Sequence, residues 1–254
     1  MKLLENLVVA LSMYSKIPMP QIEWTKENMR YALCFFPVVG IAVGAVVRLW
    51  YDLSFLLSAG TLLRTAVLVL IPVIITGGIH LDGLLDTADA LSSWQTKERR
   101  LEILKDSHAG AFAIIVCCCY FLAAFGIWSE ADRSSVVILS FGFILSRALS
   151  GFGISTFPCA RDSGLAATFS NAADQRKSRN ILLAEAAACI VLMLVFDVKR
   201  GVLAAATAIL VCLLCRKMAD GKFGGITGDI QGFFLQVCEL AMAYTVIIGG
   251  RLWS

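Results

Sequence analysis

The chain has 254 residues, of which 58% are hydrophobic and only 16% are charged, and its mean hydropathy is +0.78. These values lie outside the usual range of soluble domains and predict an all-α, polytopic membrane helical bundle. The formal net charge of +3 is small and the basic residues are scattered, which excludes nucleic acid as a partner. The length fits a single integral membrane domain over residues 1–254, surrounded by membrane lipid, with no separate soluble domain.

Seven apolar runs, bounded by charged or turn-forming residues, predict transmembrane helices. They cover residues 31–50, 65–81, 111–128, 135–157, 180–196, 201–215 and 233–250. The run at 201–215 is shorter than a usual span and is expected to take residues from its flanks. Gly40 and Gly44 have the spacing that favours close packing of two helices. We therefore expect about seven transmembrane helices, with six or eight as the alternatives.

The lysine and arginine residues are divided unequally between the segments that connect these spans. With the N-terminus inside the cell, the inner segments hold 15 of them and the outer segments hold 5. Such an excess predicts an N-inside, C-outside topology in the cell (inner or plasma) membrane. The aspartates between residues 82 and 106, together with Asp229, then all lie on the cytoplasmic side, where nucleotides are found.

The most informative motif is the string HLDGLLDTAD at residues 80–89, directly after an apolar run. Its carboxylates, Asp82, Asp86 and Asp89, stand at positions i, i+4 and i+7, which share an arc of roughly 60° on a helix. Three acids on one face suit a divalent cation, so these residues are candidate catalytic residues and metal ligands. The pattern favours a metal-dependent reaction on a diphosphate at a membrane surface. A solvated charged helix face is the alternative.

Residues 82–110 are expected to form a cytoplasmic catalytic loop. Both histidines of the chain, His80 and His108, flank it. His80 is a candidate acid or base, and Asp106 is a further candidate catalytic carboxylate and metal ligand. Lys105 is a candidate contact to a substrate phosphate. The alternatives are hydrogen-bonded histidines at the membrane interface and a surface ion pair between Lys105 and Asp106.

A second polar segment, GGITGDIQG at residues 224–232, precedes the last predicted span. Gly224, Gly225 and Gly228 would let the backbone approach a ligand closely, and amides at a helix N-terminus favour anionic oxygen. We expect a diphosphate cradle completed by Asp229, a candidate metal ligand. A flexible turn followed by an N-terminal aspartate is the alternative.

Arg147 lies in the middle of a predicted span. A buried arginine either pairs with an acid or lines a polar cavity. We favour the polar cavity, which makes Arg147 a candidate residue for binding an anionic substrate.

The order of these motifs resembles that of a known enzyme family. The resemblance is carried by FPVVG at 36–40, GGIHLDGLLDTAD at 77–89, KDS at 105–107 with Gly110, Ser146-Arg147, and GGITGD at 224–229 with Gly232. On these residues the chain is similar to the adenosylcobinamide-GDP ribazoletransferases, also called cobalamin-5′-phosphate synthases. The resemblance extends over nearly the whole chain.

The resemblance implies a membrane phosphotransferase that needs Mg²⁺. Such an enzyme takes a corrinoid-GDP and a ribazole, replaces GMP with α-ribazole or its 5′-phosphate, and forms adenosylcobalamin or its 5′-phosphate. Asp82, Asp86 and Asp89, with Asp106 and Asp229, would hold Mg²⁺ at the diphosphate, and catalysis would come mainly from positioning and charge neutralisation. The spacing does not choose between an aspartate and His80 as the proton acceptor. The number of chains is equally open, and a homo-oligomer is one option.

Two other functions stay open. A CDP-alcohol phosphotransferase also places several aspartates at helical spacing beside a membrane, but the DG-x2-AR part of its motif is missing here. A membrane transporter would explain the spans and the buried Arg147. It would not require so many acids on one side of the membrane.

Overall fold

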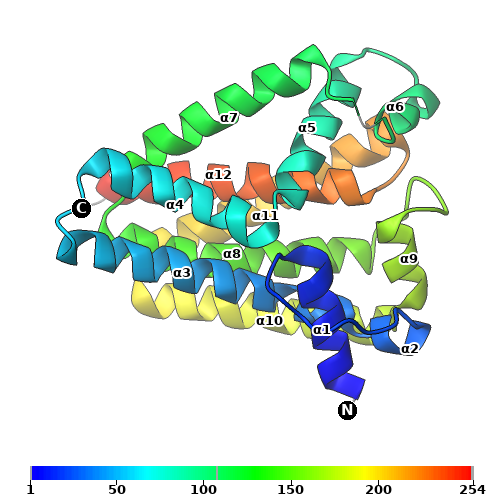
Figure 1. Cartoon of the computed structure of the whole chain (residues 1–254), viewed down its shortest axis with the longest axis horizontal. Coiled ribbons are helices and arrows are strands. Elements are labelled where there is room, and N and C mark those ends of the chain that lie inside the picture. The colour runs from blue at the N-terminus through cyan, green and yellow to red at the C-terminus, as the bar shows by residue number, and fades with distance from the viewer. Residues whose placement is uncertain (1, 107, 253–254) are drawn as a thin grey trace.

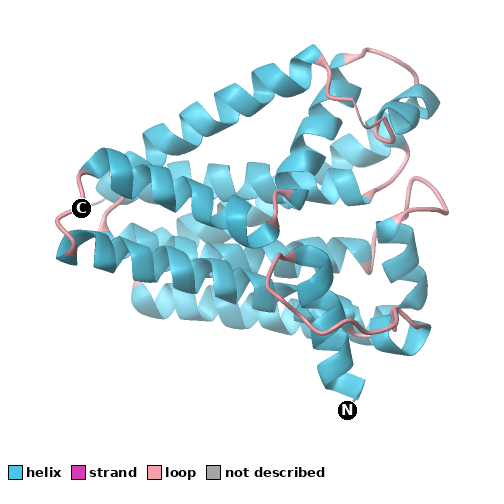
Figure 2. Ribbon diagram, in the orientation of Figure 1, coloured by secondary structure: helices cyan, strands magenta, loops and turns pink. Residues whose placement is uncertain are grey.

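The computed structural model describes residues 2–106 and 108–252. All regular elements within these ranges are helices, and their β pairing is limited to one isolated bridge between Cys159 and Ile226 (Figure 2). The prediction of an all-α bundle is confirmed.

Figure 1 shows how the helices follow one another along the chain. They are α1 (Lys2–Tyr14), α2 (Lys26–Met29), the 3₁₀ helix η1 (Ala32–Phe35), α3 (Phe36–Leu56), α4 (Thr61–Thr76), α5 (Ile79–Ser92), α6 (Lys97–Ile103), α7 (Ala111–Ser129), α8 (Arg133–Ile154), α9 (Leu165–Ala172), α10 (Gln175–Phe196), α11 (Val198–Phe223) and α12 (Gly228–Leu252).

The lengths and composition of these helices match a multi-pass membrane protein. In the described part of the chain, six helices are long and apolar enough to cross a membrane, and the bent pair α4 and α5 raises the number to seven. This agrees with the expected seven spans. The run predicted at 201–215 extends at both ends into the 26-residue α11, as its short length required.

The predicted span at 65–81 is wrong in one respect, because it is not one straight helix. α4 ends at Thr76, and Gly77 and Gly78 follow with φ of 65° and 80°. These left-handed conformations are open to glycine and end a helix. α5 then leaves at 93° to α4. α5 therefore runs across one end of the bundle (Figure 1).

The expected loop over residues 82–110 is also largely helical, because it contains most of α5 and all of α6. α5, α6 and α9 lie at one end of the bundle, and the chain leaves α12 at the other end (Figure 1). The first carboxylate motif is thus held on a helix rather than on a mobile segment.

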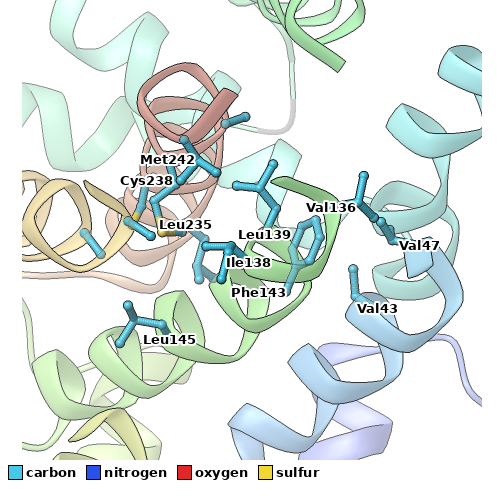
Figure 3. Packing of buried hydrophobic residues seen from close by; sticks show 14 of the residues in the cluster. Val43, Val47, Val136, Ile138, Leu139, Phe143, Leu145, Leu235, Cys238 and Met242 are labelled. Atoms are coloured by element: carbon cyan, nitrogen blue, oxygen red, sulfur yellow. The ribbon is translucent and has the colours of Figure 1, made fainter. Parts of the chain in front are cut away.

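α8 forms the centre of the bundle and packs on α3 and α12 (Figure 3). The apolar contacts include Val43 and Val47 of α3, Phe143 of α8 and Met242 of α12. At Gly40 an added Cβ would lie 2.4 Å from the carbonyl oxygen of Phe143, and at Gly44 it would lie 2.4 Å from that of Ser140. The two glycines therefore bring the backbones of α3 and α8 into contact, as their spacing predicted.

A buried ion pair joins α8 to α12. The guanidinium of Arg147 donates to the carboxylate of Glu239 over 2.6 Å, and the hydroxyl of Ser146 donates to the same oxygen over 2.9 Å. The side chain of Arg147 is only 1% exposed. An unpaired charge would be costly at this depth, so the partner acid accounts for both charged residues. The expectation that Arg147 lines a polar cavity is wrong, since it pairs with an acid instead.

Candidate active site

A cavity of about 390 Å³ lies between residues of α5, α12 and their neighbours. Its walls come from α1, α3, α5, α8, α9 and α12 and from the segment between α8 and α9. Asp82 of the first motif and Asp229 of the second both line it, as do His80 and Gly228. Two motifs that are far apart in the sequence therefore meet at one site.

Two glycines bring the motifs together where α5 crosses α12. A Cβ added to Gly83 would lie 2.6 Å from the carbonyl oxygen of Asp229 and 3.1 Å from the Cα of Gly232. A Cβ added to Gly232 would lie 3.0 Å from the carbonyl oxygen of His80. All three distances are shorter than normal carbon contacts, so only glycine allows the two backbones to approach this closely. The crossing fixes Asp82 beside Asp229.

Arg161 completes the polar part of the cavity. Its guanidinium lies 3.3 Å from the carboxylate of Asp229, which also accepts a hydrogen bond from the hydroxyl of Thr227 over 3.3 Å. The segment that carries Arg161 is held in place by a short pairing, in which Ala160 donates to the carbonyl of Ile226 over 2.9 Å and Ile226 donates to that of Pro158 over 2.9 Å. The cavity therefore presents a cationic group next to its carboxylates.

Asp86 lies on the next turn of α5, outside the cavity lining. Burial raises the pKa of its carboxyl to about 7, and the negative charges of Asp82, Asp229 and Asp89 add to this rise. Carboxylates that repel one another in this way favour a bound cation, which lowers their mutual repulsion.

Two helices begin at the cavity. Ile79 and Gly228, the first residues of α5 and α12, both contribute to its lining. The free amides and the dipole at a helix N-terminus favour negative charge. Together with Arg161, these termini suit the oxygens of a phosphate group, while Asp82 and Asp229 suit the cation that accompanies it.

His80 is buried in the wall of the cavity with 4% of its surface exposed. Neither of its ring nitrogens has a hydrogen-bond partner among the described residues. Its ring packs near Phe36 at 5.6 Å and Tyr14 at 6.4 Å between ring centroids. Burial, and then the charge of Arg147, lower the pKa of His80 well below its usual value, so the imidazole is neutral.

The remaining predicted site residues lie elsewhere. The carboxylate of Asp89 accepts hydrogen bonds from the amides of Gly110 (2.6 Å) and Ala113 (2.8 Å), one at each oxygen. It thus caps the N-terminus of α7 from a neighbouring helix. A Cβ at position 110 would lie 2.7 Å from this carboxylate, which accounts for the glycine there. Asp89 is close to Asp86 but is occupied by this cap.

Lys105 and Asp106 are exposed and are absent from the cavity lining. Asp106 accepts a hydrogen bond from the backbone of His108 over 3.0 Å, and the two side chains lie 2.7 Å apart. Ser107 between them is outside the described residues. The structure does not bring this pair to the other carboxylates.

Gly224 and Gly225 form a turn rather than a cradle. The amides of both donate to the carbonyl of Ala219 and so end α11. A Cβ at Gly225 would lie 2.6 Å from the carbonyl oxygen of Pro158, which leaves room for glycine alone. Of the three predicted glycines, only Gly228 lines the cavity.

Asp89 offers a direct test of these assignments. We expect Asp89→Ala to lower the free energy of unfolding by about 1–2 kcal/mol, because two amides of α7 lose their acceptor. Asp89→Asn keeps one carbonyl oxygen and should lose less. Thermal unfolding of the detergent-solubilised protein measures the effect. An unchanged unfolding midpoint together with a raised Mg²⁺ requirement would instead make Asp89 a metal ligand.

Sequence reasoning missed Arg161 as a site residue. Its only signal was a basic residue in a segment on the same side as the acidic motifs. Ser150 and Gln231, which are hydrogen-bonded to each other over 2.9 Å at the cavity wall, were missed as well. Gln231 follows Asp229 by two residues, and this proximity was the only hint that the sequence contained.

The donor set fits an open metal site rather than a closed one. Among the described residues, no three acidic, histidine or cysteine side chains are grouped so that they alone could hold a metal ion. Mg²⁺ is commonly held by one or two carboxylates, with the substrate phosphates and water as its other ligands. Asp82 and Asp229 beside an open cavity match that requirement.

The fold and the cavity define a multi-pass helical membrane protein with a polar site, suited to a phosphate group and its cation, at one end of the bundle. Residues 6–247 match the model of the cobalamin-5-phosphate synthase family. The chain belongs to this family, as the motifs of the sequence led us to expect.

Individual relatives agree with the family match. The chain is 46% identical to an adenosylcobinamide-GDP ribazoletransferase of Lachnoclostridium phytofermentans, over 98% of this chain and 95% of the relative. Proteins of the same name from Desulfitobacterium hafniense and Clostridium botulinum are 36% and 32% identical, over 93% and 97% of this chain and 94% and 98% of the relatives. No solved structure matches the chain.

Proposed function

We propose that the protein transfers the corrinoid phosphoryl group of adenosylcobinamide-GDP to α-ribazole or its 5′-phosphate and releases GMP. The family match and the names of the relatives support this reaction. The structural observation that carries the proposal is the meeting of Asp82 and Asp229 in one cavity beside Arg161. A diphosphate and its cation require this combination of charges.

The bonding changes assign roles to these residues. The oxygen of the ribose 3′-hydroxyl forms a bond to the phosphorus next to the corrinoid, the bond from that phosphorus to the oxygen of GMP breaks, and GMP keeps the electron pair. Arg161 and the helix N-termini would orient the phosphate oxygens and stabilise the developing charge. The hydroxyl proton leaves to a group of the cavity wall, for which the carboxylates of Asp82 and Asp229 are the candidates.

Mg²⁺ is the proposed cofactor. Asp82 and Asp229 would hold it, with Asp86 as a nearby third carboxylate. When bound, Mg²⁺ supplies charge neutralisation of the diphosphate. Asp89, occupied by the cap of α7, and Asp106, on the exposed segment, are not part of this proposed set.

The function is tested with the purified full chain in detergent or lipid. Adenosylcobinamide-GDP and α-ribazole should yield GMP and a corrinoid with the new nucleotide attached, and EDTA should stop the reaction. Transfer to α-ribazole from a CDP-alcohol donor, with no GMP from the corrinoid-GDP, would favour the CDP-alcohol phosphotransferase instead.

We further propose that the cavity faces the cytoplasm from the cell membrane, because basic residues divide 15 to 5 between the two sides. A reporter joined after Glu98 or Ala173 should read cytoplasmic, and one joined after Ser134 should read external. Alkaline phosphatase and fluorescent-protein fusions measure this in intact cells. An external signal at Glu98 would contradict the proposal, because the nucleotide substrate is cytoplasmic.

A further inference from the structure

The inner part of the cavity has a composition that its carboxylate end does not explain. Beyond Asp82, Asp229 and Arg161, its lining includes the apolar side chains of Met13, Phe36, Ile79, Ile154 and Leu235 and the aromatic ring of Tyr14. The polar groups there are the hydroxyl of Tyr14 and the side chains of His80, Ser150 and Gln231. Ser150 and Gln231 are already hydrogen-bonded to each other.

His80 is the group in this wall that needs a ligand. A buried imidazole whose two nitrogens lack partners is destabilising unless something in the cavity satisfies them. Its ring is stacked within an aromatic cluster, since Tyr14 and Phe36 have ring centroids 4.1 Å apart and both lie near it. The cluster therefore places the imidazole of His80 among aromatic rings, of which that of Tyr14 carries a hydroxyl.

We propose that this inner part binds the aromatic base of the acceptor nucleoside, with the ring N–H of His80 donating to the free ring nitrogen of that base. This assignment rests on the proposed function and names the place of one of its two substrates. The ring of Tyr14, which packs on Phe36, supplies the apolar contact to the base, and the ribose extends toward Asp82 and Asp229.

The chemistry of the base supports the match. A benzimidazole joined to ribose through one nitrogen keeps a single ring nitrogen as an acceptor, and the rest of its surface is apolar. One donor in an aromatic wall satisfies it. Guanine, in contrast, presents several donors and acceptors, which the apolar wall would leave unpaired at a considerable cost.

The volume of the cavity also favours a nucleoside as its ligand. A volume of about 390 Å³ lies at the lower end of the range for small-molecule pockets. It accommodates a nucleoside but not a corrin macrocycle. The corrinoid-GDP must therefore meet the cavity at its exposed lining residues, which include Asp82 and Gly228.

The test pairs a variant with a ligand that lacks the same hydrogen bond. Indole riboside has a C–H group where the benzimidazole has its free nitrogen. Equilibrium dialysis with the full chain, without Mg²⁺ and without corrinoid, gives the dissociation constants of α-ribazole and indole riboside. We expect the wild-type protein to bind α-ribazole about tenfold more tightly than indole riboside, and His80→Phe to bind both equally.

Companion variants separate this hydrogen bond from a structural role. His80→Asn keeps a donor near the ring position and should recover part of the preference for α-ribazole. Tyr244→Phe removes a half-exposed hydroxyl far from the cavity and should leave binding unchanged. In turnover, His80→Phe should raise the KM for α-ribazole and leave the KM for adenosylcobinamide-GDP within about twofold.

Several outcomes would overturn the inference. Equal losses of affinity for α-ribazole and indole riboside in His80→Phe would make the role of His80 structural. Competition by GMP for bound α-ribazole, or loss of affinity for GMP in the variant, would assign the pocket to guanosine. If the wild type releases GMP but His80→Phe keeps the preference, only this inference fails. If the wild type neither binds α-ribazole nor releases GMP, the proposed function fails.

Discussion

Asp82→Asn and Asp229→Asn should each lower the rate of GMP release by about a thousandfold, and the double variant should be little worse than either alone. Each substitution removes a negative oxygen from the place where the cation and the diphosphate are expected. Because both carboxylates line one cavity, the loss of one deprives the other of most of its effect. Their losses of transition-state free energy should therefore be far from additive.

The measurement is kcat/KM for the two single variants and the double variant at saturating Mg²⁺. Asp52→Asn is the matched control, since Asp52 is a half-exposed carboxylate paired with Arg48 on α3, away from the cavity. It should retain near wild-type activity. Asp106→Asn should also retain near wild-type activity, because Asp106 is exposed and absent from the cavity lining. Fully additive losses for Asp82 and Asp229 would mean that the two carboxylates act at separate sites.

The sequence predicted the part of this site that depends on local spacing. A helical period places Asp82 and Asp86 on one face, and the observed α5 has that face next to Asp229. The same helical period also predicted that Asp89 is a metal ligand. Spacing cannot reveal that two amides at the start of α7 occupy its carboxylate, because that contact depends on how a distant helix packs.

The same limit explains the other differences. Hydropathy predicted an apolar run through Leu81, but the left-handed backbone of Gly77 and Gly78 turns the chain by 93°. Arg147 was recognised as an intramembrane charge, yet only the packing of α8 on α12 shows that it pairs with Glu239. Arg161 had no motif to mark it, since its position is set by the pairing of residues 158–160 with Ile226.

The crossing of α5 and α12 yields the second large effect, at Gly83. We expect Gly83→Ala to lower kcat/KM by about a hundredfold, because the new methyl group would lie 2.6 Å from the carbonyl oxygen of Asp229 and must push the two backbones apart. The nearest atoms to this methyl group belong to the backbone of Asp229 and Gly232, so rotation of a side chain cannot relieve the clash. The shift moves Asp82 away from Asp229, although the substitution removes neither carboxylate.

This substitution should also lower the free energy of unfolding by about 1–3 kcal/mol, as overpacking at a buried contact does. Gly126→Ala is the matched control: Gly126 lies within α7, and an added Cβ there meets nothing within 4 Å. The control should keep full activity and gain slightly in stability, since alanine favours a helix over glycine by about 1 kcal/mol. Parallel measurements of kcat/KM and thermal unfolding distinguish the two. Wild-type activity in Gly83→Ala would show that the close approach of α5 and α12 is not what holds the two carboxylates in position for transfer.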